Sequence, residues 1–213
     1  MPEQFPPDPR LQQLLQHPAL WRGRSVAPLP VMPTGFAPLD QVLPGGGWPQ
    51  RGLIEVLTAR QGLGELRLWL PTLARLSTAS GARWCAFIAP PFQLFAPALA
   101  AAGVRLDRVL VVHPPQPLWA TEQALRSGAC DLVLSWVAQA DLPQLRRLTL
   151  ATEQGLSAGV LFRPAHAERD ASPAMLRLSV QARSGGLRLR LLKSRGAPQP
   201  VIDLTLSAWG TGP

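Results

Sequence analysis

A short apolar run that leads through a glycine-containing loop into a helical pattern constrains this chain more than any other feature. Leu53–Leu57 (LIEVL) has the composition of a buried strand, and leucines recur at helical spacing from Gly64 onward. A strand that feeds a loop and then a helix is where nucleotide-binding proteins place a P-loop. We therefore expect the rest of the chain to be arranged around this strand.

The loop itself, residues 58–65 (TARQGLGE), lacks the residues that bind phosphate in a P-loop. A P-loop reads Gly-x-x-x-x-Gly-Lys-Ser/Thr, because its backbone N–H groups and lysine hold phosphates and its hydroxyl holds magnesium. Here Thr58 stands at the first glycine, Gly64 replaces the lysine and Glu65 replaces the hydroxyl. A carboxylate at this position would repel a phosphate. The residues Thr58, Gly62, Gly64 and Glu65 thus indicate a vestigial nucleotide loop, flanked by Glu55, Arg60 and Arg67 as candidates for mutual ion pairs.

Strand-like and helix-like segments alternate after this loop. We expect strands at Leu53–Leu57, Arg83–Ala89, Val109–Val112, Asp131–Val137 and Ala158–Phe162, and helices at Glu65–Thr78, Pro97–Ala102, Leu118–Arg126 and from Asp141 to about Gly155. This alternation predicts an α/β fold with a mostly parallel sheet flanked by helices. Asp141 and Gln144 have the spacing of a capping box at the start of their helix.

The C-terminal part follows a different pattern, with strands at Leu176–Ala182, Leu187–Lys193 and Val201–Leu206 and no helices between them. Residues 184–186 (SGG) favour a tight turn between the first two strands. We therefore expect an antiparallel extension of the sheet that begins with a hairpin.

This hairpin carries much of the chain's net charge of +8, since residues 171–202 contain no Asp or Glu. Its cationic residues, six in all, are Arg177, Arg183, Arg188, Arg190, Lys193 and Arg195. Period-two alternation places arginines on one face and leucines on the other. The cationic face would either bind a phosphate backbone or an acidic partner, or be a solvated outer face that discourages edge-to-edge aggregation.

Residues 1–33 are rich in proline and cannot build a core of their own. We interpret them as an N-terminal arm, flexible in part or docking on a partner through Leu11, Leu15, Trp21 and Arg22, ahead of a core at residues 34–213. No transmembrane segment or secretion signal is recognisable, so we expect a cytoplasmic protein with no membrane contact. Cys85 and Cys130 favour buried free thiols over a disulfide or metal site.

Residues 34–57 (TGFAPLDQVLPGGGWPQRGLIEVL) resemble the segment that precedes the P-loop strand in the RecA recombinase core. LPGGGWP, GLGELRLWLPTLARLS, IAPPFQLFAPAL and LWATEQALRSGACDLVLSW together look like the ImuA family of RecA-like proteins, which accompany a mutagenic translesion polymerase system. The resemblance covers roughly Thr34 to Phe162. It implies a RecA-like core with contacts to the ImuB protein, to an error-prone DnaE-type polymerase and to RecA. Contact with DNA would come from the cationic hairpin, and self-association from the N-terminal arm.

The chain departs from an active RecA at three positions of its catalytic chemistry. Besides the loop, the second strand continues as Ile88-Ala89-Pro90-Pro91-Phe92 where RecA carries a glutamate, and the fourth strand has Ser135-Trp136 where an aspartate is expected. We therefore expect no enzyme activity, no catalytic residue, no cofactor and no metal. A non-catalytic adaptor of SOS mutagenesis is one interpretation; a division inhibitor resembling SulA, which binds FtsZ, is the alternative.

Overall fold

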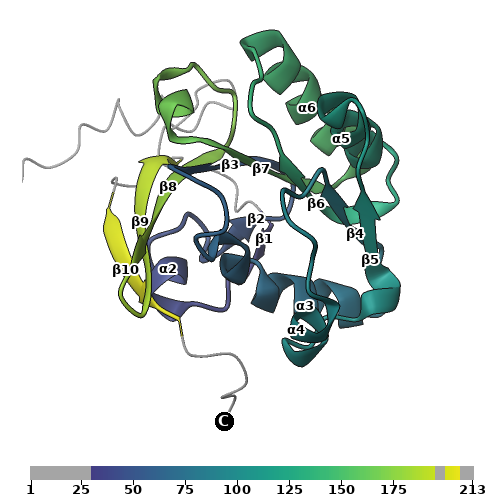
Figure 1. Ribbon diagram of the computed structural model, residues 1–213. Coiled ribbons are helices and arrows are strands. Elements are labelled where there is room, and N and C mark those ends of the chain that lie inside the picture. Colours follow the sequence, from purple (N-terminus) through teal and green to yellow (C-terminus); the bar gives the residue numbers. More distant parts are fainter. Residues whose placement is uncertain (1–29, 195–199, 207–213) are drawn as a thin grey trace, which may run out of the picture.

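An eight-stranded sheet with helices on both faces forms the centre of the computed structural model, which describes residues 30–194 and 200–206 (Figure 1). Its strand order is β10-β9-β8-β3-β7-β6-β4-β5. The strands are β3 (Gly52–Thr58), β4 (Trp84–Ile88), β5 (Val109–Val112), β6 (Cys130–Trp136), β7 (Ala158–Pro164), β8 (Leu176–Arg183), β9 (Gly186–Lys193) and β10 (Val201–Thr205). Strands β3 to β8 are parallel, whereas β9 and β10 add in antiparallel order. The predicted α/β class and its antiparallel C-terminal extension are confirmed.

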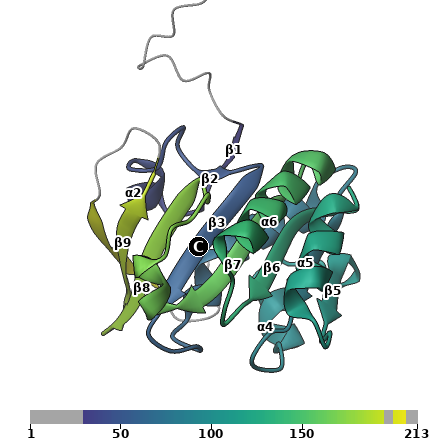
Figure 2. The same ribbon diagram turned by 90° about the horizontal axis from the view of Figure 1, so that it is seen from above.

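Helices cover both faces of the parallel strands. The helical segments are α2 (Ala37–Asp40), η1 (Glu65–Leu68), α3 (Leu70–Thr78), α4 (Ala96–Ala101), η2 (Leu106–Arg108), α5 (Pro117–Arg126), α6 (Leu142–Gly155) and η3 (Ala165–Arg169). Figure 1 shows α5 and α6 on one face and α3 and α4 on the other, and Figure 2 looks onto the face that α5 and α6 cover. Each face buries its own apolar cluster, because alternate residues of β3 such as Leu53 and Ile54 point to opposite sides. None of the described helices is both long and apolar enough to cross a lipid bilayer.

Helix α6 begins where the sequence predicted. Asp141 Oδ1 accepts a hydrogen bond from Gln144 N at 2.7 Å, and Gln144 Oε1 accepts one from Asp141 N at 2.9 Å. This reciprocal pair satisfies two of the N–H groups that have no partner inside the helix. The capping box is therefore confirmed.

The helix expected at Glu65–Thr78 is divided into two pieces. Residues 65–68 form the 3-10 helix η1, and the α-helix α3 begins only at Leu70. Pro71 explains the break, since proline fits the first turn of a helix and lacks the N–H that an interior position needs. Trp69, between the two pieces, is fully buried and stacks on Trp48 with ring centroids 4.4 Å apart.

The core begins earlier than the arm boundary at residue 33 implies. Val31 and Met32 form strand β1, which pairs with the two-residue strand β2 (Trp48–Pro49). Pro33 contributes its carbonyl oxygen as acceptor for Arg75 Nη2 at 2.9 Å. Residues 31–33 therefore belong to the core, while Leu11, Leu15, Trp21 and Arg22 lie outside the described residues.

The two cysteines are buried free thiols on neighbouring strands, as the sequence predicted. Cys85 lies on β4 and Cys130 on β6. Burial raises the pKa of the Cys85 thiol to about 12, with a smaller contribution from Asp131. At neutral pH this thiol is therefore protonated and behaves as a small apolar side chain.

Candidate functional site

The loop after β3 (residues 59–64, the β3–η1 loop) lies at the carboxyl edge of the parallel strands, where open α/β sheets bind ligands. Thr58, the last residue of β3, is buried. Gly62 and Gly64 adopt φ values of +79° and +93°, which other residues rarely adopt. A Cβ atom on Gly62 would lie 3.1 Å from the Phe92 ring. The loop therefore packs closely against the segment that follows β4.

Glu65 lies beneath this loop with only 4% of its surface exposed. Its Oε1 atom accepts a hydrogen bond from Gly62 N at 3.0 Å. Its Oε2 atom is buried and has no hydrogen-bond partner among the described residues. The side-chain carboxylate thus occupies the Gly62 amide, and in a P-loop backbone amides of this loop hold phosphate.

A cleft of about 700 Å³ opens between the β3–η1 loop and the connection from β4 to α4. The chain turns at Ala89, which has a φ of +52°, before the connection Pro90–Phe95. The lining is mostly apolar: Leu66, Leu70, Pro90, Pro91, Phe92, Leu94, Phe95, Pro97, Ala98, Leu99, Ala101 and Trp136, with Gly62, Gly64, Glu65, Arg67 and Gln93. Phe92 and Phe95 are 60% and 70% exposed. The cleft is therefore suited to an apolar ligand.

Trp136, at the end of β6, lines the floor between this cleft and a second one of about 540 Å³. Its ring stacks on Phe162 at a centroid distance of 4.5 Å and on Phe87 at 6.4 Å. Its Nε1 donor is buried and meets no acceptor in the part of the chain that the structure describes. The preceding Ser135 hydroxyl lies 2.7 Å from that of Thr121, so it is already engaged within the protein.

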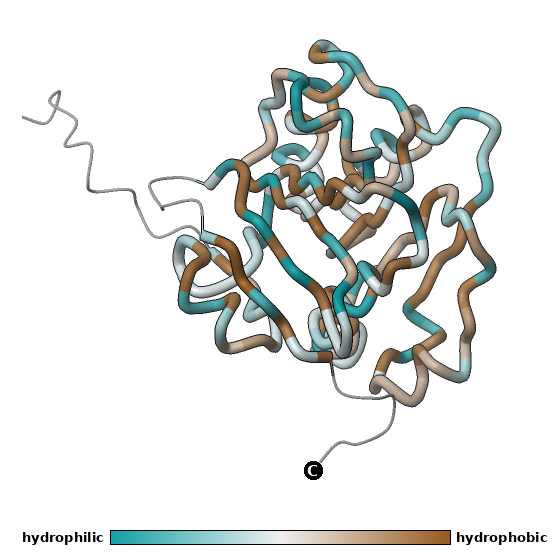
Figure 3. Tube along the Cα trace, turned by 60° about the vertical axis from the view of Figure 1, so that its left-hand side comes forward, coloured by the Kyte–Doolittle hydropathy of each residue, from teal (hydrophilic) through white to brown (hydrophobic). Residues whose placement is uncertain are grey.

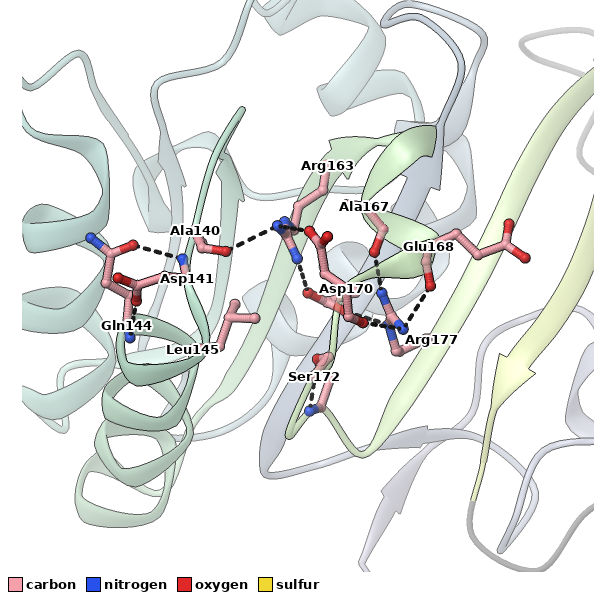
Figure 4. A network of polar contacts seen from close by, with 12 residues as sticks. Ala140, Asp141, Gln144, Leu145, Arg163, Ala167, Glu168, Asp170, Ser172 and Arg177 are labelled. Atoms are coloured by element: carbon pink, nitrogen blue, oxygen red, sulfur yellow. Dashed lines mark hydrogen bonds and ion pairs between the residues drawn. The ribbon is translucent and has the colours of Figure 1, made fainter.

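Glu55 does not pair with Arg60 or Arg67, and that expectation is wrong. It is fully buried on β3, where Arg163 Nη1 donates to Oε1 at 2.7 Å and Arg177 Nε donates to Oε2. Figure 4 shows that Arg177 also donates to the backbone carbonyl of Ala167 in η3, whereas Arg163 donates to the carbonyl of Ala140 ahead of α6 and to the Asp170 carboxylate. This group is a structural charge cluster on the same face of β3 as Leu53, which packs in the apolar cluster under α5 and α6.

Arg177 is consequently not part of a basic surface, because it is only 7% exposed. Figure 3 shows the alternation of hydrophobic and hydrophilic residues along the C-terminal strands, but the polar face of β8 near Arg177 is covered by the η3 segment. Alternation along one strand identifies two faces, and it does not tell which of them another segment covers.

The exposed cations of the hairpin all have acceptors. Arg188 donates two hydrogen bonds to Asp203 at 2.8 and 3.0 Å, and Arg183 forms an ion pair with the same carboxylate. Arg190 binds Glu168 at 2.7 Å, and Lys193 Nζ donates to the Ser172 carbonyl at 2.7 Å. The hydrogen bonds from Arg188 lower the pKa of the Asp203 carboxyl below its ordinary value. Four cations against two carboxylates leave this face positive, while Arg195 lies outside the described residues.

Sequence reasoning missed the residues that shape the cleft, above all Phe92, Phe95 and Trp136. The available signal was the run PPFQLF, in which large apolar residues occur in a proline-bounded connection outside any strand or helix period. Among residues 30–194 and 200–206, no group of three or more His, Cys, Asp or Glu side chains is arranged to hold a metal ion.

The sequence of this chain is similar to a known protein family and to individual proteins of known name. The family model of the MT3502 N-terminal domain matches residues 41–164, more than half of the chain. The chain belongs to this family.

The curated relatives of this chain include RecA and SulA proteins. It is 34% identical to Protein RecA 1 of Myxococcus xanthus over 49% of this chain and 30% of the relative. It is 33% identical to the cell division inhibitor SulA of Pectobacterium atrosepticum over 49% of this chain and 63% of the relative. It is also 33% identical to SulA of Edwardsiella piscicida, over 54% of this chain and 70% of that relative.

The match with the crystal structure of SulA from Pseudomonas aeruginosa has a TM-score of 0.44 and 29% sequence identity over 52% of this chain and 97% of that one. The sequence relatives place the chain in the RecA/SulA superfamily. It spans about a third of the length of the RecA relatives and about two thirds of the SulA relatives.

Proposed function

We propose that this chain is a RecA-like adaptor that binds other proteins, hydrolyses no ATP and acts in error-prone translesion DNA synthesis during SOS mutagenesis. The observation that carries the proposal is the hydrogen bond from Gly62 N to Glu65 Oε1. An anion-binding loop needs free backbone amides and positive charge, but here a carboxylate of the protein takes the amide. A phosphate in the same place would be repelled by Glu65.

Among the described residues, the strand ends beside the loop also lack the carboxylates that promote phosphoryl transfer. That reaction requires a magnesium ligand, a lysine or arginine on the phosphates and a residue that positions the nucleophile. The connection after β4 offers prolines and phenylalanines, and β6 ends in Ser135 and Trp136. Ser135 is fully buried, and its hydroxyl is hydrogen-bonded to that of Thr121.

The partners in this proposal are the ImuB protein and an error-prone DnaE-type polymerase, with RecA as a further partner. The ImuA resemblance of the sequence supports this choice, and the RecA and SulA relatives are consistent with it. Exposed Phe92, Phe95 and Trp119 supply aromatic anchors of the kind found at protein interfaces. The net positive hairpin face is the candidate for contact with DNA, and the N-terminal arm for docking or self-association.

A second candidate is a division inhibitor that binds FtsZ. The similarity to cell division inhibitor SulA covers 70% of the Edwardsiella piscicida protein, against 30% of the Myxococcus xanthus RecA. Neither the adaptor nor the division inhibitor needs to hydrolyse a nucleotide, so the two functions are distinguished by the protein that each binds.

The deciding experiment is a pull-down of purified ImuB, DnaE-type polymerase, RecA and FtsZ, each tested separately, with the tagged full chain. We expect retention of ImuB or the polymerase without added nucleotide. Retention of FtsZ alone would move the protein to the division-inhibitor class. If none of the four is retained, the adaptor proposal is wrong.

A further inference from the structure

We propose that the cleft beside the β3–η1 loop binds a short apolar segment of a partner protein that carries one arginine or lysine side chain. Glu65 recognises the basic group, Trp136 donates to a backbone carbonyl of the segment, and Phe92 and Phe95 hold its apolar residues. This inference rests on the proposed adaptor function for its biological context, and the cleft chemistry is tested independently of that function.

Glu65 supplies the charge selectivity. Its Oε2 atom is buried and lacks a donor, and a buried polar atom without a partner costs more than it would in water. Arg67 also lines the cleft, and it already has an interaction of its own. A guanidinium or ammonium group placed beside Glu65 would supply the missing donor and balance the carboxylate.

Trp136 supplies a second, directional contact. Its indole ring is 7% exposed and held by the stack with Phe162, so the Nε1 donor is fixed in orientation. No acceptor within the described residues meets this donor. Trp136 lines the cleft, and its indole N–H can be satisfied by a peptide carbonyl, which an extended segment offers at every residue.

The rim and walls supply the apolar contact area. Phe92 and Phe95 are among the most exposed large apolar side chains of the described residues. Phe92 is supported from behind by Gly62, whose missing side chain allows the ring to lie close to the loop. Exposed aromatic side chains beside a hollow are typical anchors for a partner, because their burial removes a large apolar area from water.

The same features argue against a nucleotide as the occupant. A triphosphate brings several negative charges toward a buried carboxylate, whereas a basic side chain brings the opposite charge. The volume of about 700 Å³ is in the usual range of ligand pockets and accommodates a few residues of a peptide.

The test uses the full chain and the peptide acetyl-Leu-Phe-Arg-Leu-amide, with the peptide in which citrulline replaces arginine as the neutral isostere. The indole N–H resonance of Trp136 is followed by NMR, assigned from its loss in Trp136→Phe. We expect this resonance to shift on titration, and the arginine peptide to bind about tenfold more tightly than the citrulline peptide.

Variants separate charge recognition from apolar contact. Glu65→Gln should bind both peptides equally, because it keeps the shape and removes the charge. Phe95→Ala should weaken both peptides by about fivefold. Glu153→Gln, an exposed glutamate on α6, is the matched control and should behave as the unmodified chain.

Equal affinity of the unmodified chain for the two peptides, or titration without movement of the Trp136 resonance, would overturn the inference. The pull-down above has an independent outcome. Partner retention that persists in Glu65→Gln and Phe95→Ala would leave the adaptor function in place and reject this cleft as the docking site.

Discussion

Two buried glutamates close to the end of β3, Glu55 and Glu65, have opposite surroundings. Both oxygens of Glu55 accept hydrogen bonds from arginines, and those arginines reach further acceptors around η3. Glu65 has one oxygen on the amide of Gly62 and the other without a partner in the described residues. The Glu55 carboxylate belongs to a hydrogen-bond network inside the fold, whereas Glu65 lines the wall of an open cleft.

The comparison shows how a buried charge can be assigned a role. The Glu55 carboxylate connects strands β3, β7 and β8, and because both its oxygens are paired it has no free acceptor for a ligand. A buried carboxylate with an unused oxygen has a free energy cost that a cationic ligand can remove. We therefore assign Glu55 to the fold and Glu65 to binding.

The largest effect is expected for Glu55→Gln. This substitution leaves Arg163 with only the half-exposed Asp170 and Arg177 with no carboxylate among the described residues, so the free energy of unfolding should fall by about 3 kcal/mol. Urea denaturation measures the loss. Glu65→Gln should cost less than about 1 kcal/mol, because its amide oxygen can still accept from Gly62 N. Equal losses in the two variants would remove the basis of the comparison.

A smaller effect is expected for Gly62→Ala. An alanine there must adopt a left-handed φ and press on the Phe92 ring, so we expect about 2 kcal/mol of destabilisation in urea titrations. Gly81→Ala is the matched control, since Gly81 has a φ of +73° and open space around the Cβ position. If both variants lose the same stability, the β3–η1 loop does not pack on Phe92 as described.

The smallest effect is expected at the hairpin surface, for Asp203→Asn. Arg188 lowers the pKa of the folded-state Asp203 carboxyl, so the stabilisation is present above the unfolded-state pKa of about 3.9 and is lost as the pH falls through the lower folded-state pKa. Asp203→Asn should therefore have a lower urea midpoint than the unmodified chain at pH 7. The difference should shrink as the pH falls below about 4. A difference that stays constant with pH would show that the ion pair is not its cause.

The sequence predicted the elements of this fold well, for identifiable reasons. Apolar runs of strand length, such as Val109–Val112, are buried in the parallel sheet or form its edge, and polar signals such as Asp141 with Gln144 act locally. The sequence also shows directly that the P-loop residues are missing from positions 58–65, because this depends only on which amino acids stand there. Such local features can be predicted without knowing which distant segments pack against them.

The sequence could not reveal features that depend on segments distant along the chain. Arg177 has the alternation of a surface residue, but η3 covers it and Glu55 meets it from a strand more than a hundred positions earlier. Phe92 and Phe95 have no period that would assign them to a cleft. Their role becomes visible only because the turn at Ala89 brings the connection beside the β3–η1 loop.

The central claim is that the β3–η1 loop binds no nucleotide because Glu65 takes the place of the anion. The most direct measurement is a titration of fluorescently labelled ATP into the full chain, with magnesium present and unlabelled ATP as competitor. The account predicts no saturable signal up to millimolar ATP. Saturable binding that unlabelled ATP displaces would contradict it and restore the loop as a nucleotide site.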